Sequence, residues 1–318
     1  MGVFVFLPLV LPLSAWPVAR LAETRLHPRT ATRLLTAVAV VMAVCSTLCL
    51  ALLMVVGTAQ LPGNPPPDSV REDPQPDGWS DPEVLAAVAH DEVAGRGAIP
   101  ALALVTAACA RTLGRHRRVT RRARRALAGV PGRTVAVLPD RRPYAYAFPG
   151  GRSRIVVTTA LPAGLAPAER RALFAHERAH LAARHHRHLL AAHLAARANP
   201  FLRPLRTAVV HTAERWADEE AARAVGDRRT VARAIGKAAL LSPGTPAPTL
   251  AALATGGPVP RRVAALLAPA PAVRTWPSAF TSVGLAAWGA AAGALVSAMS
   301  SANSAVTLFL ILHAATPM

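Results

Sequence analysis

Long apolar stretches alternate with polar ones along this chain, and their lengths predict membrane helices around one soluble segment. Residues 34–57 form the clearest apolar stretch, which is long enough to cross a hydrocarbon core of about 30 Å. Residues 3–19 and 97–113 are two further predicted spans, the second only if arginines at its ends reach the interfaces. Residues 276–318 carry no charged side chain and predict a last span, with a hairpin of two helices as the alternative.

The stretches between these spans set the predicted topology. A secretory signal is the alternative for residues 3–19, but no basic residue precedes them. Arginines follow them, so residues 1–57 are expected to hold two spans joined by a short basic cytoplasmic loop. Residues 58–96 are acidic and Pro-rich, which suits an extracytoplasmic loop with little internal structure. Residues 114–275 contain no run long enough to span, so they are the predicted soluble domain.

An arginine cluster after the third predicted span places this domain in the cytoplasm. Cytoplasmic ends of membrane helices carry an excess of Lys and Arg, and this cluster is the strongest such marker in the chain. The cluster consists of Arg111, Arg115, Arg117, Arg118, Arg121, Arg122, Arg124 and Arg125.

The composition adds two observations, one on the excess of basic residues and one on the cysteines. The 318 residues are 52% hydrophobic, with 36 Lys and Arg against 17 Asp and Glu, a formal charge of +19. Such a charge also suits nucleic-acid binding. Because the arginine cluster has no aromatic interleaving and no known motif, we expect contact with anionic lipid headgroups and no direct nucleic-acid binding. Cys45, Cys49 and Cys109 lie in apolar runs, which predicts buried free thiols instead of a disulfide framework.

The soluble segment contains the pattern H-E-x-x-H inside a run of strong helix formers. Pro167 suits the first turn of the predicted helix, and Glu169 favours its positive end. His176 and His180 are four positions apart, so their imidazoles leave the same face. That spacing lets two nitrogens bind one zinc ion. Glu177 lies close enough to accept a proton from a metal-bound water.

A catalytic zinc needs a third protein ligand and an open position for water. His186 has the spacing of such a ligand only if the helix breaks soon after His180. Ala183 stands where a helix-breaking glycine would be needed, and in a continuous helix His186 points away from the site. The remaining nearby histidines are excluded on similar grounds and are expected at the surface or near the membrane: His185, His188 and His193.

A second helix, predicted from about Leu205 to Val225 and ended by Gly226, carries the better candidate. Glu214 and Asp218 are one turn apart on one face. Glu214 can therefore bind zinc, while Asp218 accepts the N–H of a ligand histidine. The alternative is a solvated face of ion pairs among Glu214, Glu219, Glu220, Arg215 and Arg223. The H-E-x-x-H pattern in the same segment favours the ligand interpretation.

Short strands are predicted before the motif helix. Residues 133–138 and 154–159 have strand composition. Tyr144–Phe148 lies between them and ends at a Pro-Gly-Gly turn signal, which predicts a hairpin. The expected fold class is α+β: a mainly helical zinc-peptidase-like domain with a small β-sheet, plus about four transmembrane helices.

The combined pattern resembles a known group of enzymes. H-E-x-x-H followed by Glu-x-x-x-Asp in a membrane protein resembles the HtpX and CAAX-prenyl endopeptidases and, more closely, the BlaR/MecR-type antirepressor peptidases. The supporting strings are Tyr146–Gly150, Ile155–Thr159, Ala168–Glu177 and Asn199–Phe201. This resemblance implies a gluzincin fold, in which a small sheet packs on two ligand-bearing helices with one zinc ion per chain.

Two features depart from the family pattern. HtpX-like enzymes often carry an asparagine just before an Ala-Phe-Ala string, and Tyr144 stands at that place here. The beta-lactam sensors of the family carry a large penicillin-binding domain after their last span, and no such domain follows within these 318 residues. Recognition of beta-lactams by this chain is therefore not expected.

The expected function is that of an integral, multi-pass protein of the cytoplasmic membrane that acts as a zinc metalloendopeptidase. Zinc would be held by His176, His180 and Glu214, with Asp218 behind them and Glu177 as the general base. The resemblance implies a cytoplasmic transcriptional repressor as the protein substrate, cut in response to an envelope signal. The alternatives are HtpX-like turnover of membrane proteins and a non-catalytic membrane signal transducer.

Two finer details complete the expectation. The strand Ile155–Thr159 is expected to bind the substrate backbone by edge addition, an idea drawn partly from the resemblance. Tyr146 and His211 are both candidates for the residue that stabilises the oxyanion, and the sequence does not choose between them.

Overall fold

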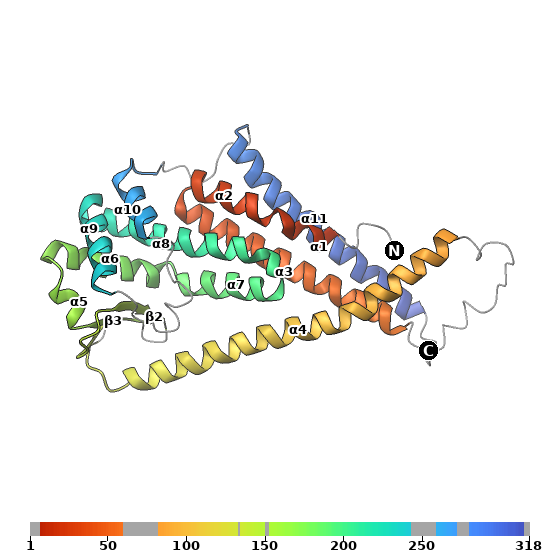
Figure 1. Ribbon diagram of the computed structural model, residues 1–318, viewed down its shortest axis with the longest axis horizontal. Coiled ribbons are helices and arrows are strands. Elements are labelled where there is room, and N and C mark those ends of the chain that lie inside the picture. Colours follow the sequence, from red (N-terminus) through yellow and green to blue (C-terminus); the bar gives the residue numbers. More distant parts are fainter. Residues whose placement is uncertain are drawn as a thin grey trace.

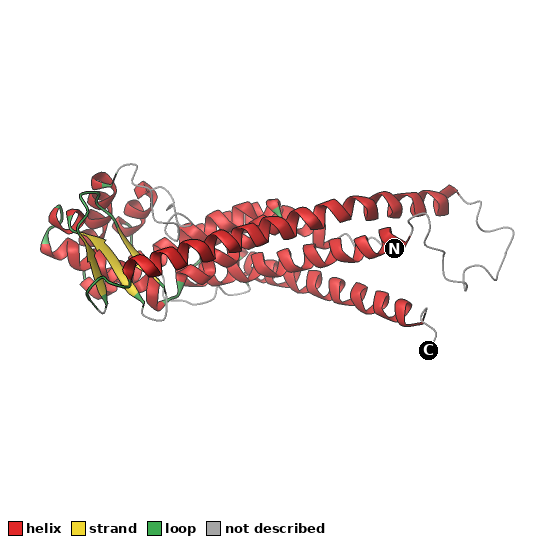
Figure 2. Ribbon diagram, turned by 90° about the horizontal axis from the view of Figure 1, so that it is seen from below, coloured by secondary structure: helices red, strands yellow, loops and turns green. Residues whose placement is uncertain are grey.

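The computed structural model describes residues 7–59, 82–132, 134–149, 153–242, 259–271 and 280–314. Its architecture is mainly helical with one small sheet, which confirms this part of the predicted fold class (Figures 1 and 2). Long helices form an elongated bundle, and the sheet lies with several shorter helices at one end of it.

The helices begin and end as follows: α1 Leu7–Val10, the 3-10 helix η2 Leu11–Ser14, α2 Ala15–Arg25, α3 Pro28–Ala59, α4 Pro82–Leu127, α5 Ala160–Ala163, α6 Pro167–Ala182, α7 His185–Ala198, the 3-10 helix η4 Pro200–Leu202, α8 Arg203–Val225, α9 Arg228–Leu241, α10 Val259–Leu267 and α11 Ser282–Ala314. The strands are β1 Val135–Leu138, β2 Ala145–Phe148 and β3 Arg154–Thr158.

The strands form one sheet in the order β1-β3-β2. β3 pairs with β2 in antiparallel register, as the predicted hairpin requires, and with β1 in parallel register. The prediction that Ile155–Thr159 binds substrate by edge addition is wrong, because both edges of β3 are already paired. Within the described part of the chain, β2 pairs with no second strand and is an open edge of the sheet.

The register shows which backbone groups of β2 face that open edge. The N–H of Thr158 donates to the carbonyl of Tyr144 at 3.0 Å, and every second residue of an antiparallel strand faces its partner. The backbone groups of Tyr146 therefore face β3. Those of Ala145 and Ala147 face away from β3.

Two helices in the described part of the chain are long and apolar enough to cross a membrane, not four. They are Pro28–Val55 in α3, with a mean hydropathy of 2.7, and Arg96–Leu127 in α4, with a mean hydropathy of 1.4. The predicted span at residues 3–19 is not one long helix, because a 3-10 turn at Pro12 interrupts it. Proline lacks the backbone N–H that a continuous α-helix uses.

Two other predicted boundaries differ from the structure. Residues 82–96 of the predicted acidic loop are helical and belong to α4, and residues 60–81 lie outside the described part. α4 also continues without a break past residue 113 to Leu127. α11 is a single helix and not a hairpin, as expected. Its crossing of a membrane stays a prediction.

The largest buried cluster joins α3 to the helices that follow the sheet. Leu35 and Met42 of α3 lie in one cluster with Leu205 and Val209 of α8. Leu189 of α7 belongs to the same cluster. The first half of the predicted span 34–57 is therefore packed against protein, and half of the most apolar window of α3 is buried.

Two buried hydrogen bonds link the same elements. Thr32 of α3 donates its hydroxyl to the hydroxyl of Thr212 on α8 at 3.0 Å. Asn199, which ends α7, donates its side-chain amide to the hydroxyl of Ser46 on α3 at 3.1 Å. Buried hydrogen bonds of this kind fix the register of helices that apolar packing alone would allow to slide.

Candidate metal centre

Helix α6 begins where the sequence predicts. Pro167 is its first residue, and a carboxylate oxygen of Glu169 accepts the backbone N–H of Ala166 at 2.9 Å, which satisfies one of the free donors at the helix start. Lys237 of α9 pairs with the same carboxylate at 2.8 Å. These contacts fix the start of the helix that carries the motif histidines.

Helix α8 supplies the other half of the site. It runs from Arg203 to Val225 and ends at Gly226, whose φ of 78° is left-handed, so the predicted bounds hold to within two residues. Buried alanines on α8, among them Ala213, Ala217 and Ala221, let neighbouring helices approach closely. α8 packs directly against α6, which brings the two helices' polar faces together.

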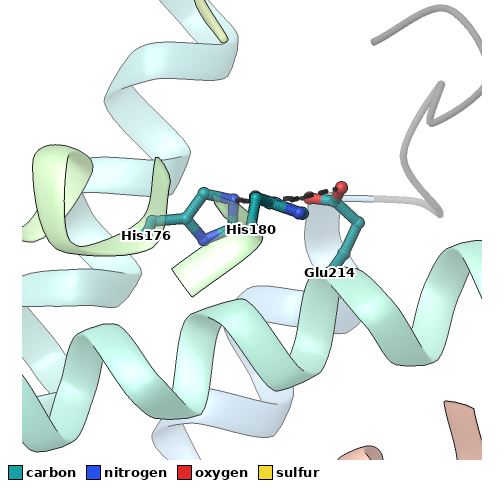
Figure 3. A group of neighbouring side chains, drawn as sticks. All are labelled: His176, His180 and Glu214. Carbon is teal, nitrogen blue, oxygen red and sulfur yellow. Dashed lines mark hydrogen bonds and ion pairs between the residues drawn. The ribbon is translucent and has the colours of Figure 1, made fainter. Parts of the chain in front are cut away.

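His176, His180 and Glu214 converge at this contact (Figure 3). The Nε2 atoms of the two imidazoles are 3.0 Å apart. Each nitrogen lies 3.5 Å from one oxygen of Glu214. Two ligand atoms of a tetrahedral zinc ion, each about 2.05 Å from the metal, are about 3.3 Å apart. The observed separations are close to that value, so the three side chains could hold one metal ion.

Asp218 and a buried arginine lie behind the candidate ligands. A carboxylate oxygen of Asp218 is 2.9 Å from Nδ1 of His176, on the ring side away from Glu214. Arg262 of α10 donates Nε and Nη2 to the two oxygens of Asp218 at 2.8 and 2.6 Å. Its Nη1 lies 2.9 Å from an oxygen of Glu214. One guanidinium thus orients both carboxylates.

Charge and burial set the protonation states of these groups. Burial opposes ionisation of Glu214 and Asp218, but the charge of Arg262 and the contacts with the motif histidines together outweigh it and hold the pKa of both carboxyl groups below the usual range. Burial also disfavours a charged His176, yet its hydrogen bonds to Asp218 and Glu214 and the charge of Asp218 together raise its pKa to about 10. Burial lowers the pKa of His180 to about 4. Metal binding at His176 would therefore release a proton.

Glu177 is buried beside the three candidate ligands. The backbone N–H of Ala147 on β2 donates a hydrogen bond to the carboxylate of Glu177, so the edge strand of the sheet contacts the site directly. Burial raises the pKa of Glu177 to about 6, although the charge of His176 opposes this shift. A carboxyl group with a pKa near neutrality is suited to general acid–base chemistry.

The expectation that His185 lies at the surface or near the membrane is wrong. The motif helix ends at Ala182, because Arg184 takes a left-handed conformation with φ 53°, and α7 begins at His185. His185 is not at the surface: it is 1% exposed, and its Nδ1 lies 2.8 Å from Nδ1 of His180. His186 is not among the residues that converge on the candidate metal site.

The remaining predicted residues lie around the site without joining it. Among the acidic residues of α8, Glu220 pairs with Arg223 on a partly exposed face, as the alternative requires. Glu219 is buried and pairs with Arg228, and Glu214 is buried at the site, so the alternative of a solvated face fails for both. Tyr146 lies on β2, and His211 lies on α8 one turn before Glu214. His188 and His193 are partly buried on α7.

Arg262 and His185 are the two site residues that sequence reasoning missed. Arg262 is far from the motif in sequence, and nothing in its spacing links it to Glu214. His185 follows His180 in a run with no helix-breaking residue, and a continuous helix there would point its side chain away from the site.

Two histidines from H-E-x-x-H, a carboxylate from a second helix and a buried glutamate are the groups that zinc metallopeptidases use. Residues 110–197 match the model of peptidase family M48, which is zinc-dependent. The matched segment contains the motif but ends before Glu214, and it covers less than a third of the chain. The match supports a metallopeptidase of this family without distinguishing the BlaR/MecR-type subgroup. No curated protein and no solved structure matches the chain.

Proposed function

We propose that this protein is a membrane-bound zinc metalloendopeptidase. The observation that carries the proposal is the convergence of His176, His180 and Glu214 from two helices, with Glu177 buried beside them. The donor set suits zinc, because two imidazoles and one carboxylate are a common set in catalytic zinc sites and leave a fourth position open. Asp218 contacts the second ring nitrogen of His176, and Arg262 donates to Asp218, so both orient the candidate ligands.

In the proposed peptide hydrolysis, each residue of the site has its own role. Zinc, when bound, lowers the pKa of a water and polarises the scissile carbonyl. Asp218 holds the ring of His176 so that its Nε2 faces the site. Glu177 accepts a proton from the attacking water and later gives it to the nitrogen of the departing amine. A single buried carboxyl group with a raised pKa can perform both transfers.

The open edge of the sheet is the proposed binding site for the substrate backbone. The N–H of Ala147 already donates to Glu177, so the outward-facing groups that a substrate can use are the N–H of Ala145 and the carbonyls of Ala145 and Ala147. An extended peptide can add to such an edge by main-chain hydrogen bonds. β2 therefore replaces the strand Ile155–Thr159 in this role.

We further propose that the site faces the cytoplasm and that the substrate is a cytoplasmic transcriptional repressor. Two observations support the orientation: α3 and α4 are candidate membrane spans, and the arginine cluster lies on α4 at the end near the sheet. The repressor as substrate rests on the resemblance to the BlaR/MecR-type peptidases. Turnover of membrane proteins in the manner of HtpX is the second candidate, and it is favoured by the packing of the site's helices against α3.

The test compares purified wild-type protein with Glu177→Gln in detergent, using casein as substrate. The variant is expected to keep one zinc ion per chain and to lose about 10²- to 10⁴-fold in cleavage rate, the usual contribution of a general base. Glu23→Gln on α2, outside the site, is the matched control and should cleave like wild type. Equal cleavage by wild type and Glu177→Gln would remove the catalytic assignment.

A further inference from the structure

The contact between His180 and His185 is unusual for a ligand histidine. Metal-bound histidines almost always donate their second ring N–H to a carboxylate, a carbonyl or a water. His176 follows this rule with Asp218. His180 instead meets a second imidazole, with 2.8 Å between the two Nδ1 atoms.

Hydrogen-bond chemistry fixes the roles of these two nitrogens. A neutral imidazole has one donor and one acceptor nitrogen, so one ring must donate across the 2.8 Å contact and the other must accept. Nε2 of His180 faces Glu214 and must be unprotonated to bind a metal. His180 therefore carries its proton on Nδ1 and donates it, while Nδ1 of His185 accepts.

We propose that His185 is a positioning residue for the metal centre: it accepts the Nδ1–H of His180 and so fixes the tautomer and ring orientation in which Nε2 of His180 faces the metal. The proposal rests on the proposed zinc site. His185 itself lies beyond the ring of His180, on the side away from Glu214, and so cannot be a fourth ligand to the same ion.

The surroundings of His185 hold its ring in place. The left-handed Arg184 turns the chain so that His185 opens α7 with its side chain 1% exposed. The ring meets Trp216 of α8 edge to face, with 4.7 Å between ring centroids. Trp216 is fixed in turn, because its indole N–H donates to Glu220 at 3.0 Å.

Two arginines of α3 complete this support. The guanidinium carbons of Arg29 and Arg33 lie 5.6 and 5.4 Å from the centroid of Trp216, within cation–π range. A continuous series of contacts thus runs from α3 through Trp216 and His185 to His180. Helix α3 thus supports one metal ligand through four side chains: Arg29, Arg33, Trp216 and His185.

The test measures zinc affinity of the full chain in detergent by competition with a chelator. His185→Asn keeps an acceptor oxygen near the position of Nδ1 and should bind zinc nearly as tightly as wild type. His185→Gln carries its oxygen near the position of Nε2, and His185→Leu has no acceptor. Both should bind about 10- to 100-fold more weakly, as expected for loss of a partner behind a metal ligand.

An unchanged zinc affinity of His185→Leu would overturn the proposal, because the ring would then have no effect on the metal. An equal loss of zinc affinity in His185→Asn and His185→Leu would also overturn it, because the ring would then act only by filling space. Should the leucine variant fail to fold by circular dichroism, the asparagine and glutamine pair decides alone: equal affinities reject the proposal. His176→Ala separates this result from the proposed function. If wild type binds no zinc, or His176→Ala binds it equally well, the zinc site itself is rejected.

Discussion

Arg262 shows how a single residue governs the balance of charge at the site. It is 8% exposed and contacts both Asp218 and Glu214. Two carboxylates that close together would repel each other strongly in a poorly solvated interior. The arginine compensates them, and its planar guanidinium also holds Asp218 in a bidentate geometry that a lysine could not reproduce.

Replacing Arg262 should destabilise the protein by leaving two buried carboxylates without their partner. We expect Arg262→Met to lower the free energy of unfolding by about 3–5 kcal/mol, the usual effect of breaking a buried ion pair from one side. The loss should be smaller with saturating zinc, because the cation compensates Glu214. Thermal unfolding with chelator and with zinc measures both effects. The adjacent, exposed Arg261→Met is the control, and equal melting temperatures of the two variants would contradict the prediction.

Residue spacing was enough to find some members of the site and not others. His176, His180, Glu214 and Asp218 follow from one-turn spacings on two helices, and the structure brings all four together. Arg262 comes from α10, and its contact depends on how distant helices pack. His185 was missed because a left-handed arginine, which costs about 1–2 kcal/mol, was not expected to end the motif helix.

At the scale of elements, the sheet shows what local pattern can and cannot predict. Alternating and β-branched residues predicted the strands, and the turn signal predicted the hairpin of β2 and β3. The parallel pairing of β1 with β3 joins residues about twenty positions apart, such as Val135 and Ile155. No local pattern specifies that pairing, so the sequence could not show that β3 is central and β2 is the edge.

Because β2 is an edge strand, a substitution at Ala145 is expected to change the kinetics of peptide cleavage. Its N–H faces away from β3, so Ala145→Pro removes an outward donor and leaves the pairing with β3 intact, as proline on edge strands allows. One lost hydrogen bond of about 1 kcal/mol should lower kcat/KM about fivefold, mainly through KM. Steady-state cleavage of a peptide substrate measures the change. Ala145→Val keeps the donor and serves as control, and unchanged kcat/KM in the proline variant would exclude the edge as a binding site.

At the scale of the molecule, the membrane part and the site are not separate units. The sequence divides them by hydropathy, with boundaries at residues 57 and 113. The structure instead packs α3 against α7 and α8, and continues α4 unbroken towards the sheet. Hydropathy reports how apolar a helix is. It does not distinguish a helix surrounded by lipid from one whose buried face meets other helices.

The proposed orientation can be tested by labelling. Gly129 follows the end of α4 and is exposed, so a thiol placed there should report the side on which the sheet lies. In a chain whose three native cysteines are replaced, Gly129→Cys should react with an impermeant maleimide only after cells are permeabilised. Ser69→Cys, in the acidic segment, should react in intact cells. Labelling of Gly129→Cys in intact cells would exclude a cytoplasmic repressor as the substrate.

The hydrogen bonds that join α3 to α7 and α8 couple the position of α3 to that of the candidate metal centre. Thr212 is two residues before Glu214, so a displacement of α3 that carries Thr32 along must also pull on the turn that presents this carboxylate. A shift of one residue along the helix axis is about 1.5 Å, whereas working sites are held to within about 0.5 Å. In the proposed membrane peptidase, a displacement of α3 along its axis therefore alters the position of Glu214 directly, with no diffusing messenger.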